Sequence, residues 1–125
     1  MSRGDALYGL LYGGQTKMDA RAIAEFVEAE LGRRDGLENL HGITKANVRQ
    51  FLVTPYEVTV DPDDGESAPR PMWVVLHERA PARGAYAVVF NPADLTWGVV
   101  EWTDSGERLT MVVAAATLFE ALEGM

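Results

Sequence analysis

The sequence predicts a single α+β domain in which helices pack on an antiparallel five-stranded meander. Apolar residues recur at helical spacing in residues 17–31, and they alternate with polar residues at a period of two from Tyr56 onward. The stretches between the predicted strands are too short for crossover helices, so successive strands are expected to be antiparallel neighbours. A chain of 125 residues has the size of one domain. We therefore assign residues 1–125 to one two-layer α-α-β5-α unit.

The first helix is expected over Lys17–Leu31, with Thr16 as its N-cap and Gly32 as a left-handed residue that ends it. The preceding segment, Gly9–Thr16, has the glycine spacing of a phosphate-binding loop. Gln15 stands where that motif needs lysine. We interpret the segment as a glycine-rich approach to a capped helix.

Two shorter helices are predicted further along the chain. One begins at Thr44 and ends near Leu52, because Pro55 disfavours helix immediately before it. The other covers residues 117–123, where Thr117 and Glu120 have the spacing of a capping box.

Five segments have the alternation or composition of β-strands. They are Tyr56–Val60, Met72–Arg79, Ala85–Asn91, Thr96–Trp102 and Arg108–Val113.

The charge of the chain limits its partners. Nineteen acidic and eleven basic residues give a formal net charge of −8. Nucleic-acid binding needs clustered Lys and Arg, so nucleic acids are not expected as partners, and neither is an anionic membrane surface. A basic protein suits this charge better.

The chain has no cysteine, which excludes disulfides and thiolate metal sites. The apolar stretch Ala6–Tyr12 is too short to span a bilayer and lacks the features of a signal peptide. We therefore expect a cytoplasmic protein, and we expect no cofactor.

An acidic loop follows the first predicted strand. Its acidic residues are Asp61, Asp63, Asp64 and Glu66. The loop does not fit a calcium-binding EF-hand, because Met72 occupies the position of the bidentate glutamate. It is interpreted as a solvated loop, or as an electrostatic attractant for a basic partner.

The candidates for catalysis are few. Neither His41 nor His77 has a second histidine at ligand spacing, so no metal site is predicted. No serine is placed near a histidine by the sequence. His77 and Glu101 would form an acid–base pair if their strands adjoined on one face.

Sorting the strands by parity separates two faces of the sheet. The face expected to meet the helices carries Tyr56, Val58, Val60, Met72, Val74, Leu76, Tyr86, Val88, Phe90, Val100, Trp102, Leu109 and Met111. The opposite face carries Glu57, Thr59, Trp73, Val75, His77, Arg79, Ala85, Ala87, Val89, Trp97, Val99, Glu101 and Thr110.

The second face is too apolar to be simply solvated. Helices could cover both faces, the second face could be an interface with a partner or a second copy, or a curled sheet could form a pocket there. The interface interpretation predicts that Trp73 and Trp97 lie on a contact surface and not in the core.

These observations favour a non-enzymatic protein-binding domain, such as an immunity protein or an antitoxin-like inhibitor that covers its partner. Its expected contact residues form an apolar centre with a charged rim: Trp73, Val75, Trp97, Val99, Glu57, Arg79 and Glu101. The partner would be a basic protein or a second copy of the chain. The alternative is a ligand-binding or weakly enzymatic domain with a pocket between sheet and helices that uses His77 and Glu101.

Overall fold

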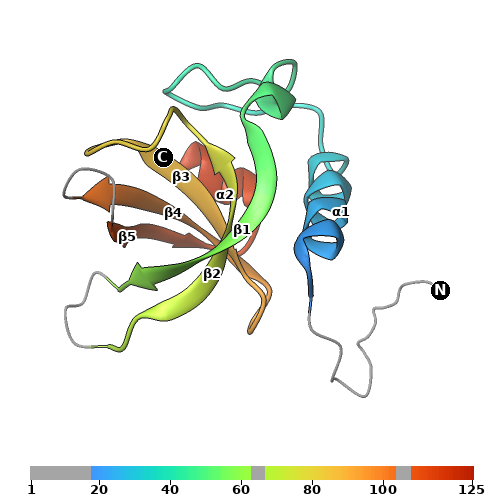
Figure 1. Cartoon of the computed structure of the whole chain (residues 1–125). Coiled ribbons are helices and arrows are strands. Elements are labelled where there is room, and N and C mark those ends of the chain that lie inside the picture. Colours follow the sequence, from blue (N-terminus) through green and yellow to red (C-terminus); the bar gives the residue numbers. More distant parts are fainter. Residues whose placement is uncertain (1–17, 63–66, 104–107) are drawn as a thin grey trace.

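The computed structural model describes residues 18–62, 67–103 and 108–125. Within these residues, two α-helices and five strands form the fold (Figure 1). In chain order they are α1 (Ala20–Leu31), β1 (Leu52–Asp61), β2 (Arg70–His77), β3 (Tyr86–Asn91), β4 (Thr96–Thr103), β5 (Arg108–Ala115) and α2 (Leu118–Glu123). The predicted α+β class and the antiparallel meander are confirmed.

The sheet closes on itself, which the two-layer prediction did not include. Each strand pairs with the next one antiparallel, and β1 and β5 complete a closed barrel through parallel pairing of Val60 with Leu109 and Asp61 with Thr110. Register shifts in the β1–β2, β2–β3 and β4–β5 pairs mark irregularities of the kind that increase strand twist. Closure is the way that a strongly twisted sheet removes its two open edges.

Helix α1 begins later than predicted. The carboxylate of Asp19 caps it by accepting a hydrogen bond from the backbone N–H of Ala22 at 2.9 Å. Thr16, the predicted cap, lies outside the described residues. Gly32 ends the helix in the right-handed region, at φ −77°, so the left-handed conformation expected there is wrong.

The second predicted helix is reduced to one 3₁₀ turn, η1 (Val48–Gln50). Thr44 and Asn47 exchange hydrogen bonds, with the Thr44 N–H donating to Asn47 Oδ1 at 2.7 Å and the Asn47 N–H donating to Thr44 Oγ1 at 3.2 Å. Such side-chain bonds to the backbone compete with helical ones. Leu52 then pairs with Leu76 and starts β1.

Helix α2 is capped as predicted. Thr117 Oγ1 accepts a hydrogen bond from the Glu120 N–H at 3.1 Å, and the Glu120 carboxylate accepts one from the Ala116 N–H at 3.1 Å. The first bond satisfies a backbone donor in the first turn of the helix, and the second satisfies the N–H of the residue just before the cap.

Two separate hydrophobic cores lie on the two sides of the sheet. The outer core is between the sheet and the helices, and its buried strand residues are Val75, Leu76, Val88, Phe90, Trp97 and Val99. The inner core fills the barrel with Val60, Met72, Val74, Ala85, Ala87, Val89, Val100, Trp102 and Leu109.

The predicted helix-facing side is divided between these two cores. Leu76, Val88 and Phe90 lie in the outer core, as that prediction requires. The prediction is wrong for the buried residues that fill the barrel interior instead, which are Val60, Met72, Val74, Val100, Trp102 and Leu109. The sequence placed Phe90 and Val74 on the same face, but the strand pairing sets Phe90 opposite Trp73 and Val74 opposite Val89.

A register shift in β2 adds to this exchange of faces. It lies between Val74 and Leu76, and both Val75 and Leu76 reach the outer core. One extra residue reverses parity along a strand, so Met72 and Val74 before the shift face the barrel interior while Leu76 after it faces the outer core, although strict alternation places all three on one face.

Candidate functional site

The predicted contact surface is largely interior. Trp97 is only 3% exposed, and Val75 and Val99 are buried with it in the outer core. Phe26 of α1 stacks on Trp97, with ring centroids 5.8 Å apart and planes inclined by 4°. The prediction that Trp97 lies on a contact surface is therefore wrong, because α1 packs over its ring in the outer core.

Trp73 and the charged residues of the predicted rim are more accessible. Trp73 is half-buried at the edge of the outer core and pairs across the strands with the exposed Glu57. Arg79 is exposed and forms an ion pair with Glu78 at 3.5 Å. Glu101 is half-buried in β4. With the apolar centre covered, these side chains do not frame an exposed apolar surface.

The structure does not bring His77 and Glu101 together. Strand β3 separates their strands, with Ala87 opposite His77 and the neighbouring Tyr86 opposite Glu101. Successive residues of a strand point to opposite faces, so His77 faces the barrel interior and Glu101 faces outward. The proposed acid–base pair is therefore wrong.

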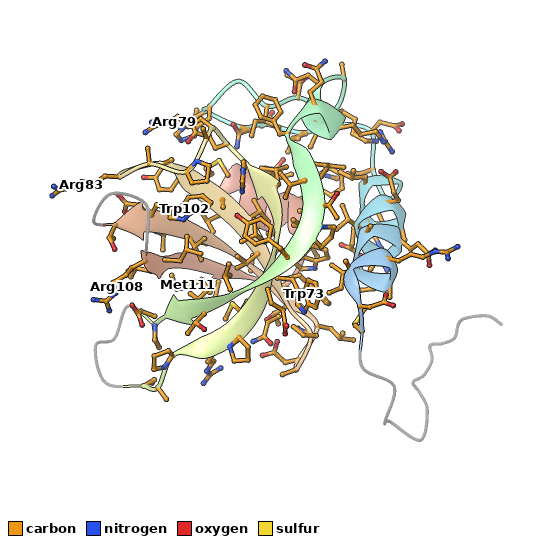
Figure 2. The ribbon with its side chains drawn as sticks, viewed as in Figure 1. Trp73, Arg79, Arg83, Trp102, Arg108 and Met111 are labelled. Atoms are coloured by element: carbon orange, nitrogen blue, oxygen red, sulfur yellow. The ribbon has the colours of Figure 1, made fainter. Side chains whose placement is uncertain are left out.

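His77 instead forms an aromatic cluster at one end of the barrel. Its Nε2 is 2.7 Å from Tyr56 Oη, and its ring meets Trp102 edge-on with centroids 5.2 Å apart. Burial lowers the pKa of His77, and it raises the pKa of Tyr56. In both side chains burial thus favours the uncharged form. In Figure 2, Trp102 lies among the strands, whereas Arg79 and Arg83 extend outward.

The other predicted polar residues occupy separate places. His41 Nδ1 lies 3.6 Å from a Glu78 oxygen. Asp61 forms an ion pair with Arg108 at 2.6 Å. Asp63, Asp64 and Glu66, like Gly9–Thr16, lie outside the described residues. Within the described part of the chain, no three His, Cys, Asp or Glu side chains converge as a metal site.

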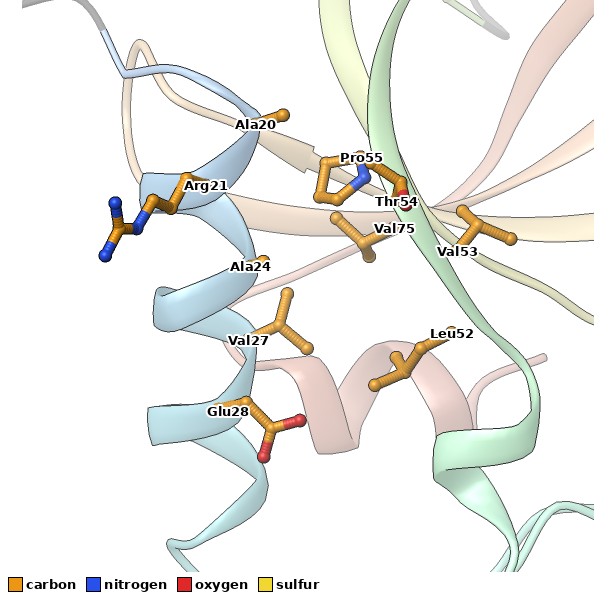
Figure 3. Close-up of a pocket in the computed structure, with 10 residues that line it drawn as sticks. All are labelled: Ala20, Arg21, Ala24, Val27, Glu28, Leu52, Val53, Thr54, Pro55 and Val75. Atoms are coloured by element: carbon orange, nitrogen blue, oxygen red, sulfur yellow. The ribbon is translucent and has the colours of Figure 1, made fainter.

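An apolar groove that the sequence did not reveal runs between α1 and β1. It encloses about 480 Å³. Ala24 and Val27 face Pro55, Leu52 and Val75 across it (Figure 3). Small alanines on the sheet-facing side of α1 leave this space unfilled. In the sequence, the groove is indicated only by alanines at helical spacing. A groove forms there only because the helix packs against β1.

The groove has charged residues along its helical side. Arg21 and Glu28 line it, and both form ion pairs on the helix surface, Arg21 with Glu25 at 3.4 Å and Glu28 with Arg49 at 2.7 Å. These exposed pairs contribute little stability in water. They place charge beside an apolar floor, which is the arrangement of many protein-binding surfaces.

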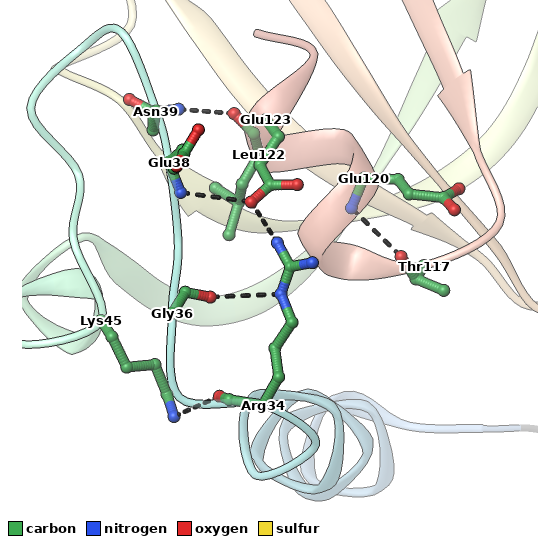
Figure 4. A network of polar contacts seen from close by, with 9 residues as sticks. All are labelled: Arg34, Gly36, Glu38, Asn39, Lys45, Thr117, Glu120, Leu122 and Glu123. Atoms are coloured by element: carbon green, nitrogen blue, oxygen red, sulfur yellow. Dashed lines mark hydrogen bonds and ion pairs between the residues drawn. The ribbon is translucent and has the colours of Figure 1, made fainter.

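The connection between α1 and η1 is fastened to the C-terminal helix (Figure 4). Arg34 forms an ion pair with Glu123, and its guanidinium lies 4.4 Å from the ring centre of Phe119. Asn39 Nδ2 donates to the Leu122 carbonyl at 2.6 Å, and Lys45 Nζ donates to the Arg34 carbonyl at 2.7 Å. These contacts assign the connection a structural role.

Comparisons with protein-family models, curated proteins and solved structures found no match to this chain. Among the described residues, neither helix has the length and hydrophobicity needed to cross a membrane.

Proposed function

We propose that this chain is a non-catalytic protein-binding domain that receives an apolar segment of its partner in the groove between α1 and β1. The open apolar groove is the observation that carries the proposal. Exposed apolar concavities rimmed by charge are typical of interaction sites. The groove replaces the tryptophan face as the recognition surface.

The chemistry of the partner follows from the charge. The chain carries a net charge of −8, so a partner with basic residues flanking its apolar segment is favoured. Within this class we favour an immunity-protein-like or antitoxin-like inhibitor, because covering a basic protein requires no catalytic group of its own. The charge and the groove are the support for this version.

The test compares two alanines of the same helix. Ala24 lines the groove, whereas Ala29 is exposed and does not line it. The wild-type chain is used to capture the partner, and the partner is then purified. The affinity of the purified partner is measured by titration for wild type, Ala24→Glu and Ala29→Glu. We expect Ala24→Glu to weaken binding by at least about tenfold, and Ala29→Glu to change it by less than about twofold.

Two results would overturn the proposal. One is equal affinity of all three proteins for the partner. The other is a lower melting temperature of Ala24→Glu with unchanged affinity, which would mean that the chain itself fills the groove.

A further inference from the structure

The two ends of the barrel differ in the residues that occupy them. At the end where β2 finishes and β3 begins, the His77 ring packs edge-on against the buried Trp102. At the opposite end, where β3 finishes and β4 begins, a cavity of about 260 Å³ opens. We call this opening the Asn91 mouth. The mouth of a β-barrel is a common position for a ligand site.

The inward-facing residues of three strands become polar at the Asn91 mouth. In β3 the inward row is Ala87, Val89 and then Asn91. The inward rows of β2 and β4 reach the same mouth at Arg70 and Thr96. The floor beneath them is apolar and is formed by Val60, Met72 and Met111. Polar groups from neighbouring strands therefore surround a single apolar cavity.

Asn91 has an unused hydrogen-bond donor in this cavity. The residue is only 7% exposed. Its Oδ1 accepts a hydrogen bond from the Ala93 N–H at 3.0 Å, which fixes the orientation of the amide. Among the described residues, none accepts a hydrogen bond from Asn91 Nδ2. A buried amide without an acceptor is costly, and a bound acceptor would remove that cost.

The charged groups at the mouth are not equivalent. Asp94 Oδ1 accepts hydrogen bonds from Thr96, from its N–H at 3.2 Å and from its Oγ1 at 2.5 Å, so this oxygen is engaged within the β3–β4 turn. Arg70 is exposed, and no described residue forms an ion pair with it. Arg70 and Asn91 Nδ2 are thus the donors that a ligand can engage.

We propose that the Asn91 mouth binds a small organic carboxylate with an apolar body. The carboxylate accepts hydrogen bonds from Asn91 Nδ2 and Arg70, and the body rests on Val60, Met72 and Met111. Charge-assisted hydrogen bonds to a carboxylate are stronger than hydrogen bonds between neutral groups. The overall charge of −8 does not prevent binding, because distant surface charges are screened at physiological ionic strength. The proposal is independent of the α1–β1 groove.

Three probes with one body and different head groups test the ligand class. They are 3-phenylpropanoate, 3-phenylpropan-1-ol and 3-phenylpropan-1-amine, each titrated into the full chain labelled with ¹⁵N and with ¹³C-methyl methionine. We expect saturable shifts of the Asn91 side-chain amide and of the Met72 and Met111 methyl signals with the carboxylate. Its affinity should be at least about tenfold higher than that of the alcohol or the amine.

Variants test the two donors. Asn91→Asp keeps the shape and the acceptor for Ala93 but replaces the Nδ2 donor with a carboxylate oxygen, and Arg70→Gln removes the charge. Each should weaken binding of 3-phenylpropanoate by at least about tenfold, whereas Arg83→Gln, a control in the connection at the opposite end, should change it by less than about twofold.

Because Arg70 is exposed, Arg70→Gln is expected to fold normally. If Asn91→Asp does not fold, the affinity of Arg70→Gln therefore decides the test. The proposal is overturned by the absence of saturable shifts up to about 10 mM carboxylate, by amine binding that is equal or tighter, or by unchanged affinity in Arg70→Gln.

Discussion

The outer core buries one face of the sheet and the inner core buries the other, and the two differ in composition. The outer core combines large side chains from the strands with both helices, and Phe26, Phe90 and Trp97 form its aromatic centre. In the described part of the chain, no helical residue belongs to the inner core, which is filled largely by smaller residues such as Ala87 and Val89. The difference teaches that the curvature of the barrel leaves room for mostly small side chains inside, with the Trp102 ring beside His77 as the exception, while the outer face accepts several rings because a helix can adjust its distance from the sheet.

Each of the two candidate binding sites is associated with one of these cores. The α1–β1 groove lies where small helical residues leave the outer core incompletely filled. The Asn91 mouth lies where the inner core ends in polar residues. Four predictions test this comparison between the cores.

The largest expected effect is the loss of a ring from the outer core. Trp97→Ala should lower the free energy of unfolding by about 3–5 kcal/mol, because the side chain is buried against Phe26 and Phe90. Trp73→Ala, the half-buried control on the same face, should cost clearly less. Denaturant unfolding measures both. Nearly unchanged stability of Trp97→Ala would show that α1 does not cover this face.

The inner core should be sensitive to added volume. A Cβ on Gly98 would lie 2.7 Å from Met111 Sδ and 3.0 Å from the Val113 carbonyl oxygen. Gly98→Ala should therefore cost about 1–3 kcal/mol of stability. Gly36→Ala, where a Cβ would meet nothing within 4 Å, is the control.

A double variant sharpens this test. Gly98→Ala with Met111→Ala should lose less stability than the sum of the two single losses, because the contact is shared. Strict additivity in denaturant unfolding would contradict the close packing of these two residues.

The cap of α2 supports only the outer core. Thr117→Ala should lower the free energy of unfolding by about 1 kcal/mol, because the Glu120 N–H loses its acceptor. Thr117→Ser retains the hydroxyl and should recover most of this loss. Equal destabilisation by both substitutions, measured by thermal melting, would indicate that the methyl group and not the cap matters.

The smallest effect concerns His77, at the end of the inner core next to Trp102. Burial lowers the pKa of His77 in the folded chain, so below pH 6.5 the unfolded chain binds more protons at this residue than the folded chain. Stability should therefore decline as pH falls from about 7.5 to 5.5, and less so in His77→Gln. Tyr56→Phe should keep the decline, since burial is its cause. An identical slope in wild type and His77→Gln would contradict this assignment.

Much of the local structure was predictable from neighbouring residues. Hairpin-length connections indicated the antiparallel order of the strands, and Thr117 with Glu120 indicated the start of α2. The first helix was predicted as an element, although Asp19 caps it in the described chain. These features depend on contacts within a few residues, so a single sequence contains the information for them.

The candidate sites were not predictable in this way. The Asn91 mouth combines residues that the sequence does not group. Arg70 lies about two strands before Asn91 in the chain, and a turn separates Asn91 from Thr96. Only the strand register shows that all three lie at the same end of the barrel. The α1–β1 groove likewise depends on how closely a helix approaches a strand. The sequence did identify Trp73 and Trp97 as unusual, but it assigned them to an exposed surface.

The sequence by itself therefore determined the kinds of element, their order along the chain and the strongly acidic net charge. Tertiary structure alone decided the closure of the sheet by β1 and β5, the irregularity around Val75 and the burial of Trp97 beneath α1. The physical reason is that alternation records only that successive residues point to opposite sides. When both sides are buried, no polarity signal distinguishes them, and one shifted residue exchanges the two faces.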